Sequence, residues 1–392
     1  MAQKTNKDKI SIVQLLSLIP DKELNDIAKR TNVNYYVKVL DGKSVLYLIL
    51  YALIECQRNS LRTMEDIFNS QSFKFLFNLD ENKTVKYNSI SERLSVIELD
   101  FFKKSYELIY RVFSKHFSVE EIEGYNLIRV DSTMISEASS KLKEGMNIGK
   151  KKDGKKQLKY TVAYDGSFPC LSKVYTNKTY LSEDKTIPDI VKMYAKKDLK
   201  SIFTFDRGVS KRTVFSELSN NKTPFVGRIN ENARYQLIDT LDSEDKTVGS
   251  LKLESDLEVK LFNKKNKCTE ETFRLITATN PETGKRYCFL TNIFDMSVEE
   301  ILSIYKKRWD IEVFFRFLKQ ELNLSHLTST SDKGIQVMLY MTLITSMLVL
   351  VYKRLNNVGY KTAVRRISLE INEFIIKLIV QKCGGDPGLV FR

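Results

Sequence analysis

The sequence is poor in the residues that many enzymes use for acid–base and metal chemistry. It holds two histidines, His116 and His326, and five cysteines that are scattered and show no C-x-x-C spacing. This pattern argues against a zinc site and against histidine-based catalysis. Any metal in this protein is therefore expected to be a hard ion held by carboxylates.

Long apolar segments are also scarce. The first residues, 1–9, carry charges and lead into no apolar stretch of signal-peptide length, so we expect no export and a cytoplasmic, nucleoid-associated location in a bacterium. The longest uncharged run, residues 337–352, is shorter than the roughly 20 residues that span a bilayer, and Thr342, Thr345 and Ser346 interrupt it. We expect a buried core helix there and no membrane partner.

The composition that remains is that of a folded, basic protein. The 392 residues are 42% hydrophobic and 11% aromatic, which excludes a disordered chain. The formal charge is +14, from 63 Lys and Arg against 49 Asp and Glu. Such an excess indicates a polyanionic partner, and both nucleic acid and a membrane surface would fit.

Few prolines and glycines punctuate the chain, so domain boundaries are inferred from changes of hydrophobic period. Five segments result: a helical DNA-binding domain (1–122), the first part of a mixed α/β core (123–228), a β-rich insertion (229–297), a helical remainder of the core with C-terminal helices (298–380) and a tail (381–392). In the first segment we expect helices to start at Asp21, at Ser44 and at the capping-box pattern Ser89-x-x-Glu92.

One polar stripe stands out near residue 310. At about 100° per helical residue, Tyr305, Arg308, Glu312 and Lys319 point the same way on a single helix, while apolar residues fill the opposite side. The stripe would hold one carboxylate among cations that suit phosphate. The alternative interpretation is the solvated face of an amphipathic helix.

Two further carboxylates follow apolar strands. Residues 127–130 lead into Asp131, and residues 202–205 lead into Asp206. Two Mg²⁺ or Mn²⁺ ions about 3.5–4 Å apart need several carboxylate oxygens converging on them. The two aspartates opposed by Glu312 would supply these oxygens, although a strand-end Asp taken singly is more often a turn or cap residue.

These residues carry a resemblance to a known family. The spacing Y-x2-R-x3-E-x6-K at Tyr305, Arg308, Glu312 and Lys319, with Asp131-Ser-Thr and Asp206-Arg-Gly, resembles the signature of bacterial DDE transposases of the insertion-sequence-four type. The resemblance covers residues 125–355. It implies an α/β fold with a ribonuclease-H-like mixed-sheet core, a β-rich insertion before the Glu, an N-terminal all-helical domain that binds transposon ends, and C-terminal helices.

The resemblance also implies roles for individual residues. Asp131, Asp206 and Glu312 would be catalytic and ligate two Mg²⁺ or Mn²⁺ ions. Residues expected to contact DNA are Tyr305, Arg308 and Lys319 of the motif, Arg207, Arg93 of the helical domain, and Lys151, Lys152, Lys155 and Lys156 of a lysine-rich connection between residues 141 and 159. The plain alternatives are a solvated connection and an ordinary surface cation.

One departure from the family concerns aromatic residues. Relatives place a Trp in the insertion to stack on a flipped base, whereas the single Trp here is Trp309 within the helix motif, where we expect it to pack. Tyr287, Phe289 and Phe273 are the candidates that could stack on a base instead, and the sequence does not choose among them.

The expected function is therefore that of a DNA transposase. It would bind the inverted ends of its element as a homodimer, hydrolyse one strand, and use the freed 3′-hydroxyl to attack a second phosphodiester, through a hairpin at the element's end and on to target DNA. Two alternatives stay open: a remnant that binds DNA without cutting it, and a host nuclease or resolvase on the same core.

Overall fold

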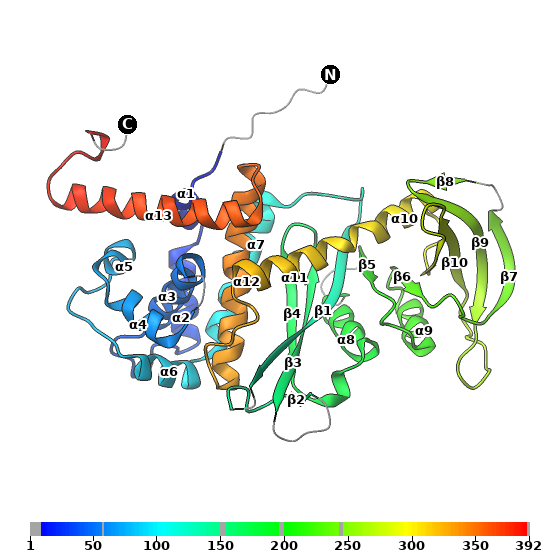
Figure 1. Ribbon diagram of the computed structural model, residues 1–392, viewed down its shortest axis with the longest axis horizontal. Helices are drawn as coiled ribbons and strands as arrows, with labels where there is room; N and C mark the ends of the chain where they lie inside the picture. The colour runs from blue at the N-terminus through cyan, green and yellow to red at the C-terminus, as the bar shows by residue number, and fades with distance from the viewer. Residues whose placement is uncertain are drawn as a thin grey trace. The chain divides into compact units, whose positions relative to one another are not determined.

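A computed structural model describes residues 9–56, 59–138, 140–148, 154–195, 200–242 and 246–389. The chain forms two compact units (Figure 1). Unit 1 comprises Met1–Ser118, Ile135–Gln157 and Arg316–Arg392, and unit 2 comprises Val119–Met134 and Leu158–Phe315. The chain passes between the units within strands β1 and β3 and within helix α11.

Unit 1 is built mainly of helices. They are α1 (Ile12–Ser17), α2 (Asp21–Arg30), α3 (Gly42–Glu55), α4 (Leu61–Asn69), α5 (Gln71–Leu76), α6 (Tyr87–Val96), α7 (Leu99–Phe117), α12 (Asp332–Leu355), α13 (Tyr360–Lys382) and the short 3₁₀ turn Pro387–Leu389. Helices α1, α3, α6, α7 and α13 all pack against α12 (Figure 1). The N-terminal and C-terminal helices thus share one core.

Helix α12 contains the uncharged run of residues 337–352. Among the described residues it is the one helix long and apolar enough to cross a membrane, but 89% of its most apolar window is buried inside the protein. Two of its hydroxyls bond within the helix, because Thr342 Oγ1 donates to Met338 O at 2.9 Å and Ser346 Oγ donates to Leu343 O at 2.7 Å. The buried hydroxyl of Thr345 has no hydrogen-bond partner among the described residues. The expected core helix is confirmed.

Two of the three expected helix starts in this unit are wrong. Helix α2 begins at Asp21 as expected, but α3 begins at Gly42, because Asp41 is the cap and its Oδ1 accepts from Ser44 N at 2.9 Å. Helix α6 begins at Tyr87, so Ser89 lies inside it. A Ser that lies two residues inside a helix has the same neighbouring sequence as a Ser that caps it. Only the backbone conformation shows which of the two positions it occupies.

Unit 2 is centred on a twisted mixed sheet. Its first strands are β1 (Asn126–Ala138), β3 (Lys155–Tyr164), β4 (Pro169–Tyr175), β5 (Ser201–Phe205) and β6 (Phe225–Ile229), in the order β4-β3-β1-β5-β6. Strands β1, β5 and β6 are parallel, and β3 and β4 form an antiparallel hairpin. With α8 (Glu183–Ala195) and α9 (Arg212–Asn220), this is the expected ribonuclease-H-like arrangement. The two-residue strand β2 (Met146–Asn147) pairs with the start of β3 in unit 1.

The β-rich insertion continues the same sheet. Its strands are β7 (Tyr235–Asp242), β8 (Thr247–Val248), β9 (Leu251–Leu261), β10 (Phe273–Asn280) and β11 (Lys285–Thr291), and the order runs β6-β11-β10-β9-β7. A buried ion pair joins β9 to β10, with Arg274 Nε 2.9 Å from Asp256 Oδ1. Arg274 also donates to Met296 O, just before α10 (Val298–Lys307). The insertion therefore anchors the return of the chain toward the core.

The polar stripe falls on two helices where a single one was expected. Helix α10 ends at Lys307 and α11 (Trp309–Glu321) begins after Arg308. The break has a local cause, because Lys307 O accepts from Arg129 Nε at 3.0 Å while Ile311 N donates to Arg308 O. Arg308 keeps right-handed helical dihedral angles, so the four stripe residues still follow helical spacing.

Removing side-chain volume from α12 should destabilise unit 1. Leu348 is fully buried, so Leu348→Ala should lower the free energy of unfolding by about 2–5 kcal/mol. Leu369→Ala on α13 is the matched control, because Leu369 is largely exposed and should change it little. Urea denaturation followed by circular dichroism measures both, and equal midpoints for the two variants would contradict a core role for α12.

Candidate active site

The strand register sets Asp131 and Asp206 side by side. Strand β1 pairs with β5 from Asn126 opposite Ser201 to Arg129 opposite Thr204. The same register carried two residues further places Asp206 level with Asp131, on strands that lie about 4.8 Å apart. Asp206 directly follows β5 as expected, whereas β1 continues past Asp131 to Ala138, so the expected end of that strand is corrected.

The helical residues of the motif meet Asp206 and one another. Tyr305 Oη donates to Asp206 Oδ1 at 3.3 Å, and Arg308 Nη2 lies 2.5 Å from Glu312 Oε1. The guanidinium of Arg308 also lies over the Tyr305 ring, 5.5 Å from its centroid. Glu312 thus stands beside a cation that links it to Tyr305 and Asp206.

Electrostatic shifts show that Asp131 belongs to the same group. Burial raises the pKa of Asp131 to about 7, and the charges of Glu183 and Glu312 add to the rise. The bond from Ser132 N, at 2.8 Å, and the charge of Arg308 act in the opposite direction. Asp131 is therefore within electrostatic reach of Glu312 and Arg308.

Arg308 and Tyr305 respond to the same charges. Burial lowers the pKa of Arg308, but Tyr305, Glu312 and Asp206 outweigh it, so the pKa is raised. Burial raises the pKa of Tyr305 to about 12, which keeps its hydroxyl protonated as a donor to Asp206. The site is a set of three carboxylates around one buried guanidinium.

The three carboxylates are grouped but not closed into a ligand set. In the part of the chain that the structure describes, no three His, Cys, Asp or Glu side chains are close enough to hold a metal ion as they stand. Arg308 occupies one oxygen of Glu312, and Tyr305 one of Asp206. The assignment of Asp131, Asp206 and Glu312 as metal ligands therefore stays a prediction.

A second buried arginine fixes the helices over the strand. Arg129 is fully buried and shares a face of β1 with Asp131, two residues on. Besides Lys307 O, it donates to Asp310 Oδ2 at 3.1 Å and to Glu121 Oε1 at 2.8 Å. This network ties the junction between α10 and α11 to β1, which brings Glu312 to Asp131.

The other residues expected to contact DNA differ in exposure and in hydrogen bonding. Arg207 is exposed beside Asp206, and Lys319 is exposed near the end of α11, in unit 1. In unit 1, Lys155 is also exposed, while Lys156 Nζ donates to Lys143 O. Lys151 and Lys152 lie outside the described residues. None of these roles in DNA binding is tested by the structure.

Arg93 has a structural role that the sequence did not indicate. Its Nε donates to Leu40 O at 2.9 Å and its Nη2 donates to Val33 O, both within unit 1. Burial lowers its pKa. The side chain thus joins α6 to the segment before α3, and any contact with DNA remains a prediction.

The sequence did not single out Glu183, Ser132 or Lys159. Lys159 was counted with the lysine-rich connection, yet it is 2% exposed on β3, and its Nζ lies 2.7 Å from Glu183 Oε1. Ser132 Oγ donates to Glu183 Oε2 at 3.0 Å. The signal that could have found them is a Lys inside an apolar strand, because such a lysine needs an acidic partner.

The aromatic candidates separate by burial. Phe273 and Phe289 are buried, whereas Tyr287 is partly exposed, with the Arg228 guanidinium 4.8 Å from its ring centroid. Trp309 was expected to pack, but it is 51% exposed. That expectation is wrong, because at helical spacing Trp309 lies on the side of α11 away from the buried Phe314 and Leu318.

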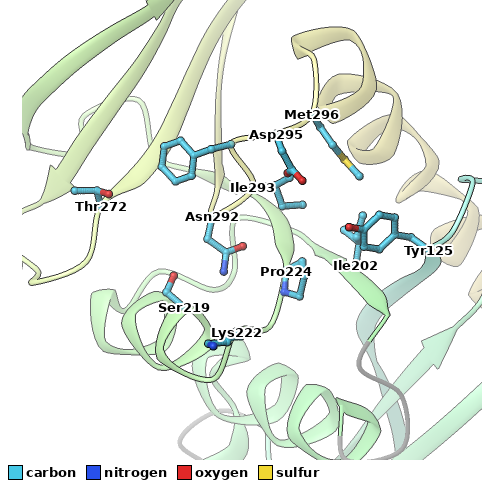
Figure 2. A pocket seen from close by; sticks show the side chains of 11 residues that line it. Tyr125, Ile202, Ser219, Lys222, Pro224, Thr272, Asn292, Ile293, Asp295 and Met296 are labelled. Carbon is cyan, nitrogen blue, oxygen red and sulfur yellow. The ribbon is translucent and has the colours of Figure 1, made fainter.

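A cavity in unit 2 lies away from these residues. Figure 2 shows it lined by Tyr125, Ile202, Pro224 and Asn292, at the end of β5 opposite to Asp206. Both polar atoms of the Asn292 side chain already have hydrogen-bond partners, because its Oδ1 accepts from Phe225 N and its Nδ2 donates to Thr223 O. The cavity is therefore separate from the acidic group.

Comparison with known families decides the identity. The family model for the transposase DDE domain matches residues 122–348, more than half of the chain. The chain belongs to the DDE transposase family. The match spans Asp131, Asp206 and Glu312, and a second family, a domain of unknown function (DUF4372), matches residues 7–76.

Curated relatives of this DDE transposase are also transposases. A protein named as probable transposase of insertion sequence element IS5377 of Geobacillus stearothermophilus is 22% identical over 84% of this chain and 81% of its own length. A transposase named for element IS4SA of Synechocystis is 28% identical over 36% of this chain and 38% of its own length. The chain also aligns with a piggyBac transposase synaptic complex with hairpin DNA, at a TM-score of 0.48 and 13% identity, over 96% of this chain and 83% of that one.

The raised pKa of Asp131 predicts a pH-dependent stability. The pKa of Asp131 is about 7 in the folded state and 3.8 ordinarily. Between about pH 4 and about pH 7 the folded protein therefore keeps a proton on Asp131 that the unfolded chain has released. Stability from this group is full below about pH 4 and is lost as the pH rises to about 7. In metal-free buffer, the Tm of Asp131→Asn should therefore exceed that of the wild type by a margin that grows as the pH rises from about 4 to about 7. A difference in Tm that stays constant over this range would contradict the burial of this charge.

Proposed function

We propose that this transposase cuts and joins DNA at the inverted ends of a bacterial insertion sequence, with Asp131, Asp206 and Glu312 as its catalytic residues. The observation that carries the proposal is the meeting of these carboxylates with Tyr305 and Arg308 in a chain of this family. Assignment to the insertion-sequence-four type rests on the motif spacing. The protein would act on the nucleoid, in the cytoplasm.

The residues fit a hard divalent cation. Asp131 is partly buried, and this burial, together with the charges of Glu183 and Glu312, raises its pKa. Oxygen donors of this kind suit Mg²⁺ or Mn²⁺, and Asp131, Asp206 and Glu312 would hold two such ions. When bound, the ions would lower the pKa of the attacking water or 3′-hydroxyl and stabilise the leaving oxygen.

The cations of the site suit the DNA backbone. Arg308 is buried, and its Nε donates to no acceptor among the described residues, so a phosphate oxygen could take this donor once neighbouring side chains move aside. The planar guanidinium would grip a phosphate with two parallel bonds, and exposed Arg207 of the same unit would add a further contact. Lys319, which is exposed in unit 1, is separately proposed to contact DNA. Tyr305 would keep Asp206 oriented through its hydroxyl.

The later steps follow from the first cut. The freed 3′-hydroxyl would attack a second phosphodiester, with a hairpin at the element's end before strand transfer to target DNA. Tyr287 is the partly exposed member of the three aromatic candidates, so it is the one that could stack on a flipped base. A homodimer would hold paired ends. Double-stranded DNA, at the inverted ends and at the target, is the partner that the excess of positive charge favours.

Glu312→Gln tests the catalytic assignment. The change removes one negative charge from the acidic group and keeps the shape of the side chain, so nicking of an end-containing duplex with Mg²⁺ should fall to background while end binding persists. The matched control is Glu299→Gln on the exposed surface of α10, which should nick as the wild type does.

Three outcomes of this assay have distinct meanings. Wild-type nicking rates in Glu312→Gln would remove Glu312 from the mechanism. Binding without nicking by the wild-type protein would favour a DNA-binding remnant. Cleavage that follows branched structure instead of end sequence would favour a host nuclease or resolvase. Short inverted repeats flanking the gene would supply the substrate.

Arg308→Ala tests the phosphate contact. Because a charge-assisted bond would be lost, both end affinity and nicking should drop by roughly 10- to 100-fold. Lys306→Ala removes the same charge from an exposed position of α10 and should have a smaller effect. Electrophoretic mobility shifts across a salt series measure the affinities, and unchanged affinity in Arg308→Ala would argue against the contact.

A further inference from the structure

The first residues of α8 contact the residue next to Asp131 and the segment that follows Asp206. Glu183 and Asp184 open the helix, and each uses both oxygens of its carboxylate. Ser132, next to Asp131, lies on one side of them, and the segment after Asp206 lies on the other. All these residues belong to unit 2.

Glu183 is held to the Asp131 side by two bonds. Its Oε2 accepts from Ser132 Oγ at 3.0 Å, and its Oε1 lies 2.7 Å from the ammonium of Lys159. Lys159 is nearly fully buried and also donates to Leu181 O at 2.9 Å, so it is a fixed partner. Because both oxygens are engaged, Glu183 is poorly placed to bind a cation itself.

Glu183 also packs against the Asp206 side. A methyl group placed on Gly208, two residues after Asp206, would lie 2.6 Å from Glu183 Cγ. The glycine therefore permits a close approach between this segment and the helix. Any larger residue at this position would have to displace the Glu183 side chain.

Asp184 completes the connection to the Asp206 side. Its Oδ1 accepts from the backbone amides of Ser210, at 2.6 Å, and Lys211, at 2.8 Å. Its Oδ2 accepts from Ser210 Oγ at 3.3 Å. The segment after Asp206 is thereby tied through its backbone to the same helical turn that holds Ser132.

We infer that Glu183 and Asp184 are positioning residues that hold Asp131 and Asp206 at the separation needed to share divalent cations. The inference rests on the proposed function. Groups that orient metal ligands through hydrogen bonds typically change metal affinity about 10- to 100-fold when they are removed. Neither carboxylate contacts the proposed ligands directly. Glu183 bonds Ser132, next to Asp131, and packs against Gly208, two residues after Asp206, while Asp184 bonds Ser210 and Lys211.

Mn²⁺ binding to the full-length protein without DNA tests this role. Free Mn²⁺ is measured by electron paramagnetic resonance, well below the Tm of each variant. Glu183→Gln and Asp184→Asn should raise the Kd for Mn²⁺ by about 10- to 100-fold. Asp189→Asn is the matched control, because Asp189 lies on the same helix and bonds Lys173 and Tyr175, on β4, and it should leave the Kd unchanged.

A second pair of variants guards against misfolding of the first. Gly208→Ala displaces Glu183 without altering its chemistry, and Ser132→Ala removes the hydroxyl that bonds Glu183 and also Thr161 and Thr186. Both should raise the Kd for Mn²⁺ in the same direction. A lowered Tm together with wild-type Mn²⁺ affinity in these variants would show that Glu183 and Asp184 support the fold alone, and it would overturn the inference.

The assay separates this inference from the proposed function. Wild-type protein that binds no Mn²⁺, or whose binding survives both Asp131→Asn and Glu312→Gln, would remove the acidic site and the inference with it. Binding that is lost in those variants but unchanged in Glu183→Gln and Asp184→Asn would leave the site standing and overturn the inference alone. Equal loss in Asp189→Asn would also overturn it.

Discussion

The geometry of the site depends on the burial of Arg129. A guanidinium without solvent must find acceptors for its donors, since an unpaired buried charge is strongly destabilising. It finds them in Glu121, in Lys307 O and in Asp310. Gly166 leaves room for the ion pair, because a methyl group there would collide with Arg129 and Glu121. The helix break at Arg308 is thus a consequence of satisfying one buried cation.

Residues on both faces of β1 position Asp131. Side chains alternate along a strand, so Arg129 and Asp131 face one way and Ser132 faces the other. On the first face, Arg129 holds the α10–α11 junction, which brings Arg308 and Glu312 to Asp131. On the second, Ser132 contacts α8 through Glu183. Asp131 lies where the constraints from both faces meet.

The sequence predicted elements and spacing better than contacts. Tyr305, Arg308 and Glu312 share one direction at helical spacing, and the structure keeps them together across a break that periodicity cannot reveal. The break arises from Arg129, whose burial is a tertiary property. Lys159 is a second case: in the sequence it cannot be told from an exposed lysine, because its partner Glu183 lies 24 residues away and comes near it only in the folded protein.

The continuous sheet explains why a long β-rich segment can separate Asp206 from Glu312. Strands β11 to β7 extend the edge at β6, so the insertion leaves the order of the core strands unchanged. The chain then returns where Arg274, paired with buried Asp256, donates to Met296 O just before α10. From there α10 packs over β5 and β6, with Ile301 and Ile304 in the core cluster. Because the return point is fixed on the sheet itself, Glu312 reaches Asp131 regardless of how far it lies along the chain.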